Sequence, residues 1–153
     1  MNLNKHLQIN WDEETGTSTC VFIDSKNNKH IGIAICHPDD KDMKSEKTGL
    51  NRAQMRAMIK YYQHIKNNEL RPQLKILQHL ESLYRNCDQN NYENKTLRKQ
   101  IYLIKNDLDV INENISILKK ELKNYINSKE SFYKSVRKHR GQKESIYNEE
   151  ISN

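Results

Sequence analysis

The chain has 153 residues, a formal net charge of +6 and charged side chains at 30% of its positions. Its mean hydropathy of −1.02 is low for a self-sufficient globular core, and only four glycines and two prolines interrupt it, a profile typical of long helices. No apolar stretch approaches the roughly 20 residues that span a membrane, and the N-terminal residues lack the apolar segment of a signal peptide. The three cysteines, odd in number and without CxxC spacing, are typical of reduced thiols in a cytoplasmic protein.

Residues 1–43 predict a small antiparallel β-sheet. Three short segments, 7–11, 17–23 and 30–36, are rich in β-branched and aromatic residues and are separated by polar turns. In the third segment, alternate residues point to opposite faces of the sheet. One face carries Ile31, Ile33 and Ile35, and the other carries His30, Gly32, Ala34 and Cys36. The small residues of the second face would let a helix approach the strand closely.

Residues 44–140 predict a helical region, so the expected fold class is α+β, with the sheet followed by a coiled-coil-like helical hairpin. Apolar residues at helical spacing indicate a first helix from about 48 to 68. Pro72 lies where a second helix could begin, because proline is tolerated in a first turn, or where one long helix could kink. Gly141 is a natural helix stop, and we expect residues 141–153 to form a flexible tail.

A long heptad helix is expected over residues 95–139, after a polar break at 88–94. Its seam consists of Leu97, Ile101, Ile104, Leu108, Ile111, Ile115, Leu118, Leu122, Tyr125 and, past Lys129, Phe132 and Val136. Such a repeat predicts a left-handed coiled coil with another helix of this chain or of a second copy. Val110, Ile117 and Ile126 lie off the seam and indicate packing against two neighbours.

Two basic stretches favour an anionic partner, although such runs are usually solvated faces. In the first, residues 129–143, Phe132 and Tyr133 lie near Arg137 in the sequence. Aromatic rings stack on bases and arginine forks bind phosphates, which predicts binding of a nucleotide, a cyclic dinucleotide or single-stranded nucleic acid. Alternatively, Phe132 and Val136 only extend the seam, and the basic residues are favourable at a helix C-terminus.

The second basic stretch runs onto the first expected helix and consists of Lys41, Lys44, Lys47, Arg52, Arg56 and Lys60. Arg52 and Arg56 are four residues apart and share one helix face. If that face is turned toward the sheet or a subunit boundary, the two arginines form a second phosphate clamp. If it is turned toward water, they have no such role.

Motifs of catalysis are scarce in this sequence. It contains no GxGxxG, Walker or HExxH spacing, and its six histidines are scattered. The segment His37-Pro38-Asp39-Asp40, with Asp42, suggests a metal or nuclease site, but the expected fold offers no later strand for the second carboxylate and lysine. A strand end followed by an Asp-rich turn is the simpler interpretation. We therefore predict no catalytic residue, no metal, no cofactor and no enzyme activity.

Two motifs resemble those of small phage-encoded proteins. Gly32-Ile-Ala34-Ile-Cys36-His-Pro38-Asp39-Asp40 fits G-x-A-x-C-x-P-x-D at the end of a β-hairpin. Gly49-Leu-Asn-Arg-Ala53-Gln-Met-Arg56-Ala57 fits G-x-x-x-A-x-x-R-A at the start of a helix. A helical hairpin ending in Phe132-Tyr133-Lys134-Ser-Val-Arg137 completes the likeness, which runs over roughly residues 17 to 140. On these motifs the chain resembles the first described family of phage Thoeris anti-defence sponges.

The resemblance implies a non-enzymatic viral protein that sequesters cyclic ADP-ribose isomers made by bacterial TIR-domain defence enzymes. Some members bind cyclic oligonucleotide signals. It also implies a homo-oligomer built from dimers, with a hexamer as one candidate size, in the cytoplasm of the infected bacterial host. Neither a membrane nor a nucleic acid is an expected partner. Arg56 and the 132–137 stretch fall on motif positions, and the predicted ligand-binding residues are Arg52, Arg56, Phe132, Tyr133 and Arg137.

Three alternatives remain open at this stage. A nucleic-acid-binding regulator would act through the basic C-terminal stretch, with an affinity that falls steeply with salt. A coiled-coil interaction protein would inhibit a host enzyme and would show no ligand-induced stabilisation. An enzyme that degrades the signal through the 37–42 segment would form a product and depend on a metal.

Overall fold

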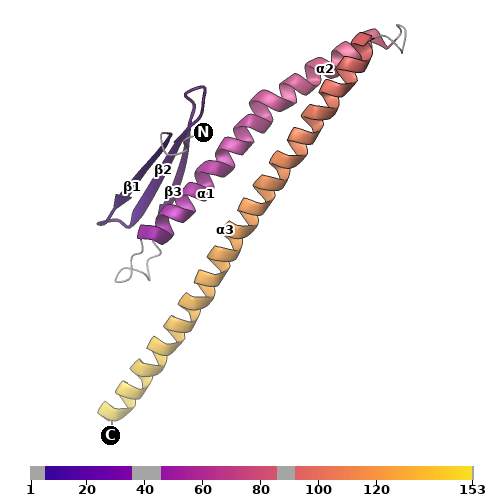
Figure 1. Cartoon of the computed structure of the whole chain (residues 1–153). Coiled ribbons are helices and arrows are strands. Elements are labelled where there is room, and N and C mark those ends of the chain that lie inside the picture. The colour runs from indigo at the N-terminus through magenta and orange to yellow at the C-terminus, as the bar shows by residue number, and fades with distance from the viewer. Residues whose placement is uncertain (1–5, 36–45, 86–91, 153) are drawn as a thin grey trace.

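The computed structural model describes residues 6–35, 46–85 and 92–152, with side chains of the last segment described from 93 to 128. The elements in chain order are β1 (Leu7–Asp12), β2 (Thr17–Ile23), β3 (Lys29–Ile35), α1 (Glu46–His64), the π-helical segment η3 (Ile65–Leu70), α2 (Arg71–Tyr84) and α3 (Tyr92–Ser152). The sheet lies on one side of α1, and α3 runs alongside α1 and α2 (Figure 1). The predicted α+β class is thus confirmed.

The three strands form an antiparallel meander in the order β1-β2-β3. Both connections are tight turns that place one residue at positive φ, Gly16 at 66° and Asn27 at 63°. Glycine adopts this conformation without strain, and asparagine tolerates it better than most residues. In the second turn the Asn27 N–H donates to the carbonyl of Asp24, and the Asp24 N–H donates to the carbonyl of Asn28. The predicted strands and turns are therefore present.

Helix α1 packs directly on the backbone of β3. A Cβ added at Gly32 would lie 1.9 Å from the carbonyl oxygen of Ala53 and 2.5 Å from the amide nitrogen of Ala57. Ala34, Ala53 and Ala57 are buried at this contact. The small-residue face predicted on the third strand is confirmed as the helix-packing face, and no side chain fits at position 32.

Helices α1 and α2 join through η3 without an intervening loop. The Arg71 N–H donates to the carbonyl of Lys66, five residues earlier, as expected of a π-helical turn. Pro72 follows at the start of α2, where its missing N–H and its ring need a wider turn than an α-helix provides. The open question of a break or a kink at Pro72 thus resolves to a continuous helix with one π-helical segment.

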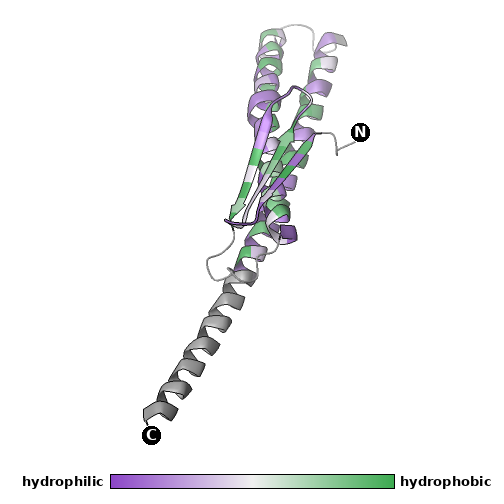
Figure 2. Ribbon diagram, turned by 90° about the vertical axis from the view of Figure 1, so that its left-hand side faces the viewer, coloured by the Kyte–Doolittle hydropathy of each residue, from purple (hydrophilic) through white to green (hydrophobic). Residues whose placement is uncertain are grey.

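The heptad seam of α3 packs within the chain, against α1, η3 and α2. Ile101 and Ile115 are buried there, whereas Val110 and Ile117, one position off the seam, are exposed. In Figure 2, apolar and polar residues alternate along α2 and along the coloured part of α3, as expected when only a narrow seam is buried. The α3 backbone continues through Gly141 to Ser152, so the expected helix stop is not observed. The flexibility of residues 141–153 stays a prediction.

Within the described ranges, no helix combines the length and the apolar character that crossing a membrane requires.

Candidate functional site

Three basic side chains form a line along α1, which we call the cationic row: Arg52, Arg56 and Lys60. They are four residues apart, so each lies about one helical turn from the next. Their contacts place the row between α3 on one side and the outer edge of β3 on the other. The shared face of Arg52 and Arg56 is thus turned toward other elements of the fold, and their role as a phosphate clamp stays a prediction.

Arg52 lies at the junction of α1 and α3. Its guanidinium carbon is 5.6 Å from the ring centroid of Tyr125, within the range of a cation–π interaction. The Nε of Arg52 is buried and has no hydrogen-bond partner among the described residues. A buried N–H group without a hydrogen-bond partner destabilises a fold, so the burial of the Arg52 Nε at this junction calls for an explanation.

Arg56 and Lys60 cover the outer edge of β3. A terminal nitrogen of Arg56 donates to the carbonyl of Ile33, and Nζ of Lys60 donates to the carbonyl of Ile31 at 2.7 Å. These carbonyls point away from β2, on the side of β3 where another strand could pair. Edge strands are commonly protected by charged side chains, so both residues have a structural role there.

The row carries positive charge that no described carboxylate is seen to pair with. Neither Arg52 nor Arg56 forms an ion pair with a carboxylate of the described residues. Partial burial, together with the nearby charge of Arg52, lowers the pKa of Arg56 below its ordinary value, although arginine stays protonated at neutral pH. Two repelling guanidinium groups held one turn apart favour an anion.

The structure places the other predicted site residues on α3. Phe132, Tyr133 and Arg137 follow Tyr125 on the same helix, seven, eight and twelve residues further along. Their side chains lie outside the described residues. The structure therefore brings Arg52 and Arg56 together and leaves the contribution of the other three as a prediction.

The motif at the start of α1 has a packing explanation. Ala53 and Ala57 contact the backbone of Gly32, and a Cβ at Gly49 would lie 2.1 Å from Oγ of Ser18. The G-x-x-x-A-x-x-R-A pattern thus describes a helix that lies close against a sheet. Its arginine, Arg56, covers the strand edge. Similarity at these positions is therefore evidence that the helix packs closely on the sheet. It is weaker evidence for a shared ligand.

A second cluster of polar groups lies at the β2–β3 turn, against the end of α1. Oδ2 of the buried Asp24 lies 3.0 Å from Nε2 of the buried His30, and Asp24 also accepts the N–H groups of Lys26 and Asn28. Burial alone would raise the pKa of Asp24, but these hydrogen bonds outweigh it and hold that pKa well below its ordinary value. The Asp24–His30 pair thus fixes the turn, as expected of a structural histidine.

Around His30 the same cluster connects the sheet to the helices. The His30 ring packs against Tyr61, with centroids 5.4 Å apart, and against His64 at 5.1 Å. Nδ1 of His64 lies 2.8 Å from the Asn68 amide nitrogen in η3, and Lys26 forms an ion pair with Glu69 at 2.9 Å. These contacts hold the turn against η3.

No group of three His, Cys, Asp or Glu side chains in the described ranges is arranged to hold a metal ion. The segment His37-Pro38-Asp39-Asp40 and Asp42, which suggested a nuclease motif, lie outside the described residues.

Tyr125 and Lys60 are members of the site that were not among the predicted ligand-binding residues. Tyr125 belongs to the heptad seam, so its pattern predicted packing alone. The four-residue spacing that linked Arg52 to Arg56 continues to Lys60 and would have found it.

No family model, no curated protein and no solved structure matches this chain.

Proposed function

We propose that this protein binds and sequesters a small cyclic nucleotide signal, a cyclic ADP-ribose isomer or a cyclic oligonucleotide, without cleaving it. The observation that carries this role is the pairing of Arg52 and Arg56, which repel each other and have no carboxylate partner among the described residues. A phosphate or pyrophosphate would supply the missing negative charge through charge-assisted hydrogen bonds. The stacking of Arg52 on Tyr125 would hold one fork ready for it.

Two further observations support the ligand class. Helix α3 carries Phe132 and Arg137 past Tyr125 at about 1.5 Å per residue, or about 10 and 18 Å further along its axis. A ligand with two phosphates and a base is of this size, so Arg52, at the near end of the row, would contact a phosphate while Phe132 or Tyr133 packs against the base or ribose. The resemblance to anti-defence sponges names the same ligand. In this role the protein acts in the cytoplasm of an infected bacterium and keeps the signal from its effector.

The test is thermal unfolding of the full chain against a panel of cyclic ADP-ribose isomers and cyclic di- and trinucleotides. We expect one class of ligand to raise the melting temperature, with a dose dependence that gives its Kd. Arg52→Ala should abolish most of this shift, because it removes the fork and leaves Arg56 alone. Arg98→Ala is the matched control, since Arg98 pairs with Glu81 between α2 and α3 and lies away from the row.

The absence of any shift across the panel would contradict the proposed function. A shift that Arg52→Ala leaves unchanged would place the ligand elsewhere on the molecule. A duplex or single-stranded oligonucleotide that binds with a steep salt dependence would favour the nucleic-acid alternative.

A further inference from the structure

Helix α1 covers two of the three strands and leaves β1 as an open edge of the sheet. The helix packs closely on β3 and β2. On β1, Trp11 lies beside Gly49 of α1 and Leu7 packs against the core, but Ile9 between them is 51% exposed. Figure 1 shows β1 on the side of the sheet away from α3, so neither long helix covers this strand.

The backbone of β1 presents outward-facing polar groups along this edge. The Ile23 N–H donates to the carbonyl of His6 at 2.8 Å, so these two residues form a hydrogen-bonded pair of the antiparallel ladder. Such pairs alternate along a strand, which directs the N–H and C=O groups of Leu7, Ile9 and Trp11 away from β2. Among the described residues, these groups have no hydrogen-bond partner. A row of this kind is a template for an added strand.

The two edges of the sheet differ in their protection. On β3, the side chains of Arg56 and Lys60 donate to outward carbonyls and so cover the edge. Strand β1 has no basic residue in its sequence, and no described side chain donates to its outward carbonyls. Because charged side chains commonly protect edge strands, their absence leaves β1 as the edge at which a further strand can pair.

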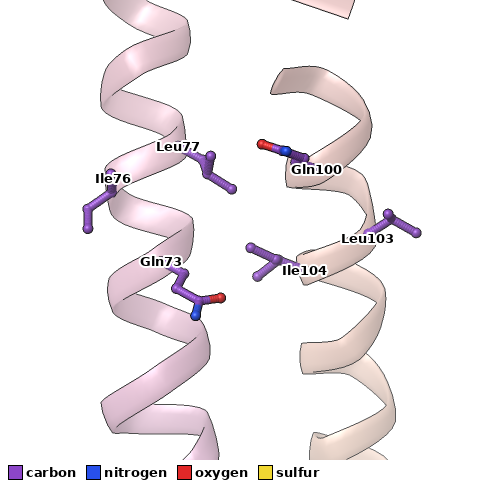
Figure 3. A pocket seen from close by; sticks show the side chains of 6 residues that line it. All are labelled: Gln73, Ile76, Leu77, Gln100, Leu103 and Ile104. Carbon is purple, nitrogen blue, oxygen red and sulfur yellow. The ribbon is translucent and has the colours of Figure 1, made fainter. Parts of the chain in front are cut away.

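The apolar surface of the helical hairpin differs in kind from this edge. A hollow of about 380 Å³ lies between α2 and α3, and Leu77 and Ile104 point toward each other across it (Figure 3). The backbone groups within both helices hydrogen-bond inside their own helix. The hollow therefore offers side chains alone, whereas β1 also offers main-chain donors and acceptors that would fix the register of a partner.

The side chains of β1 define the pattern that an added strand needs. Its apolar residues lie opposite buried residues of β2 and are therefore on the helix-facing side of the sheet: Leu7, Ile9 and Trp11. The residues between them are polar and exposed: Gln8, Asn10 and Asp12. Residues directly opposite each other in neighbouring strands share a face. An added strand therefore needs three apolar residues at alternate positions, with polar residues between them.

An acidic turn at the end of β1 adds a preference for charge. It carries Asp12, Glu13 and Glu14, and residues 12–23 contain no basic residue. The carboxylate of Asp12 accepts the Glu14 N–H and the Thr15 hydroxyl, which holds the turn close to the end of the strand. An antiparallel strand beside β1 would begin opposite Asp12. A basic residue at the N-terminal end of that strand is therefore favoured.

We propose that the open edge of β1 binds an extended segment of another protein, which adds to the sheet as a fourth, antiparallel strand. The segment has one basic residue followed by alternate apolar and polar residues. Hydrogen-bonded pairs with Leu7, Ile9 and Trp11 set its register, and its middle apolar residue packs beside Ile9. This edge is opposite the edge that carries Arg56 and Lys60, so the inference does not depend on the ligand-binding role.

The test is binding of a blocked hexapeptide, Lys-Val-Thr-Val-Thr-Val, to the full chain. Its two threonines are N-methylated, because their N–H groups would face away from β1 and the methyl groups keep the peptide from pairing with itself. Trp11 is the only tryptophan of the chain and lies on this edge, so its fluorescence reports binding of a peptide without aromatic residues. We expect a saturable fluorescence change and slower hydrogen exchange at the amides of Leu7, Ile9 and Trp11.

A second peptide of the same composition is the matched control for the backbone contact. It carries the two N-methyl groups on its first two valines, where they remove donors directed at β1. We expect it to bind at least about tenfold more weakly than the first peptide, because two hydrogen bonds are lost. Equal affinities of the two peptides would overturn the strand pairing.

Two variants of the chain locate the contact. Ile9→Lys should weaken binding of the first peptide at least about tenfold, because it places a charge at the centre of the added strand. Ile33→Lys is the matched control, since Ile33 is 47% exposed but lies on β3, with β2 between it and β1. Circular dichroism melting checks that both variants are folded. Equal weakening by both variants, or by neither, would overturn the site.

Two further outcomes would contradict the proposal. Unchanged fluorescence and unchanged amide exchange up to millimolar peptide would overturn the β1 edge as a peptide-binding surface. Sedimentation of the full chain without peptide distinguishes a second occupant. Self-association that Ile9→Lys abolishes and Ile33→Lys does not would assign the edge to another copy of this chain and overturn the partner proposed here.

Discussion

The guanidinium carbon of Arg52 lies over the ring of Tyr125, 5.6 Å from its centroid, in a cation–π contact that joins the first half of α1 to α3. The two residues are 73 positions apart in the sequence. The contact places one guanidinium group one helical turn from a second arginine, Arg56, which covers the sheet edge. A planar guanidinium held by an aromatic ring and placed next to a like charge is suited to binding a phosphate group.

The first prediction concerns the shape of this cation. Arg52→Lys keeps the positive charge but loses the planar fork and most of the stacking on Tyr125. We expect the affinity for the ligand that stabilises the wild type to fall at least about tenfold, as for loss of a bidentate contact. Stability without ligand should fall by less than about 1 kcal/mol, the size of a partly exposed cation–π contact. Isothermal titration and denaturant unfolding separate these effects, and equal affinity for both chains would argue against the stacked fork.

The second prediction concerns the contact of α1 with β3. Gly32→Ala should destabilise the fold by about 3 kcal/mol, because the added Cβ would overlap the backbone of Ala53 and Ala57 and would push the helix off the strand. Ile35→Ala, on the opposite face of the same strand and 64% exposed, should cost less than about 1 kcal/mol. Urea unfolding followed by circular dichroism measures both. Similar stabilities of the two variants would contradict the close approach.

The third prediction is a loss of stability in acid that comes from Asp24. Its pKa is held well below the ordinary value of about 3.9 by the hydrogen bonds that it accepts. The unfolded chain therefore takes up this proton first as pH falls. The stabilisation is complete above about pH 5 and is lost progressively as pH falls through 4 toward the lower pKa of the folded state. Unfolding measured from pH 7 to pH 3 should show this slope.

Asp24→Asn tests the same pair directly. We expect it to cost about 2 kcal/mol at pH 7 and to flatten the acid slope, because buried donors lose their charged acceptor. Lys26→Ala is the control from the same turn. Its ion pair with Glu69 is largely exposed, so its removal should cost less than about 1 kcal/mol and leave the slope unchanged. A steep acid slope that persists in Asp24→Asn would assign the effect to other carboxylates.

The fourth prediction concerns the edge of β3. Replacement of both Arg56 and Lys60 by glutamine removes the side chains that cover the carbonyls of Ile33 and Ile31. An uncovered edge with isoleucines beside it can pair with a strand of another molecule. We expect faster aggregation with rising thioflavin fluorescence at moderate temperature. Replacement of Lys119 and Lys123 by glutamine, on the exposed face of α3, removes the same charge and should not aggregate faster.

Local pattern was sufficient to predict much of this fold. Alternating apolar residues gave the strands and their faces, and the small residues beside Gly32 indicated a close helix, because these features depend on neighbours in the sequence. The heptad seam also predicted a paired helix. It could not say which helix is the partner, since α1, α2 and a second copy all offer apolar faces of the same period.

Long-range contacts account for the rest. Arg56 was predicted from its spacing as a ligand contact, but its hydrogen bond to Ile33 depends on where α1 crosses the sheet. Tyr125 was predicted only as a residue of the heptad seam. Its contact with Arg52 could not be predicted, because the two residues are far apart in the sequence. The π-helical turn before Pro72 lets the helix continue past a proline, which an ordinary α-helix does not accommodate in its interior. The spacing of apolar residues in the sequence does not indicate such a turn.

The most direct test of sequestration is a mass balance of the ligand. The full chain in molar excess is mixed with the nucleotide that raises its melting temperature, and free ligand is measured after ultrafiltration. The bound fraction is then released by heat and its mass and amount are determined. Binding without cleavage predicts depletion of free ligand at a fixed stoichiometry and full recovery of the intact molecule. Free ligand that is never depleted, or recovery of a cleaved product in its place, would contradict this account.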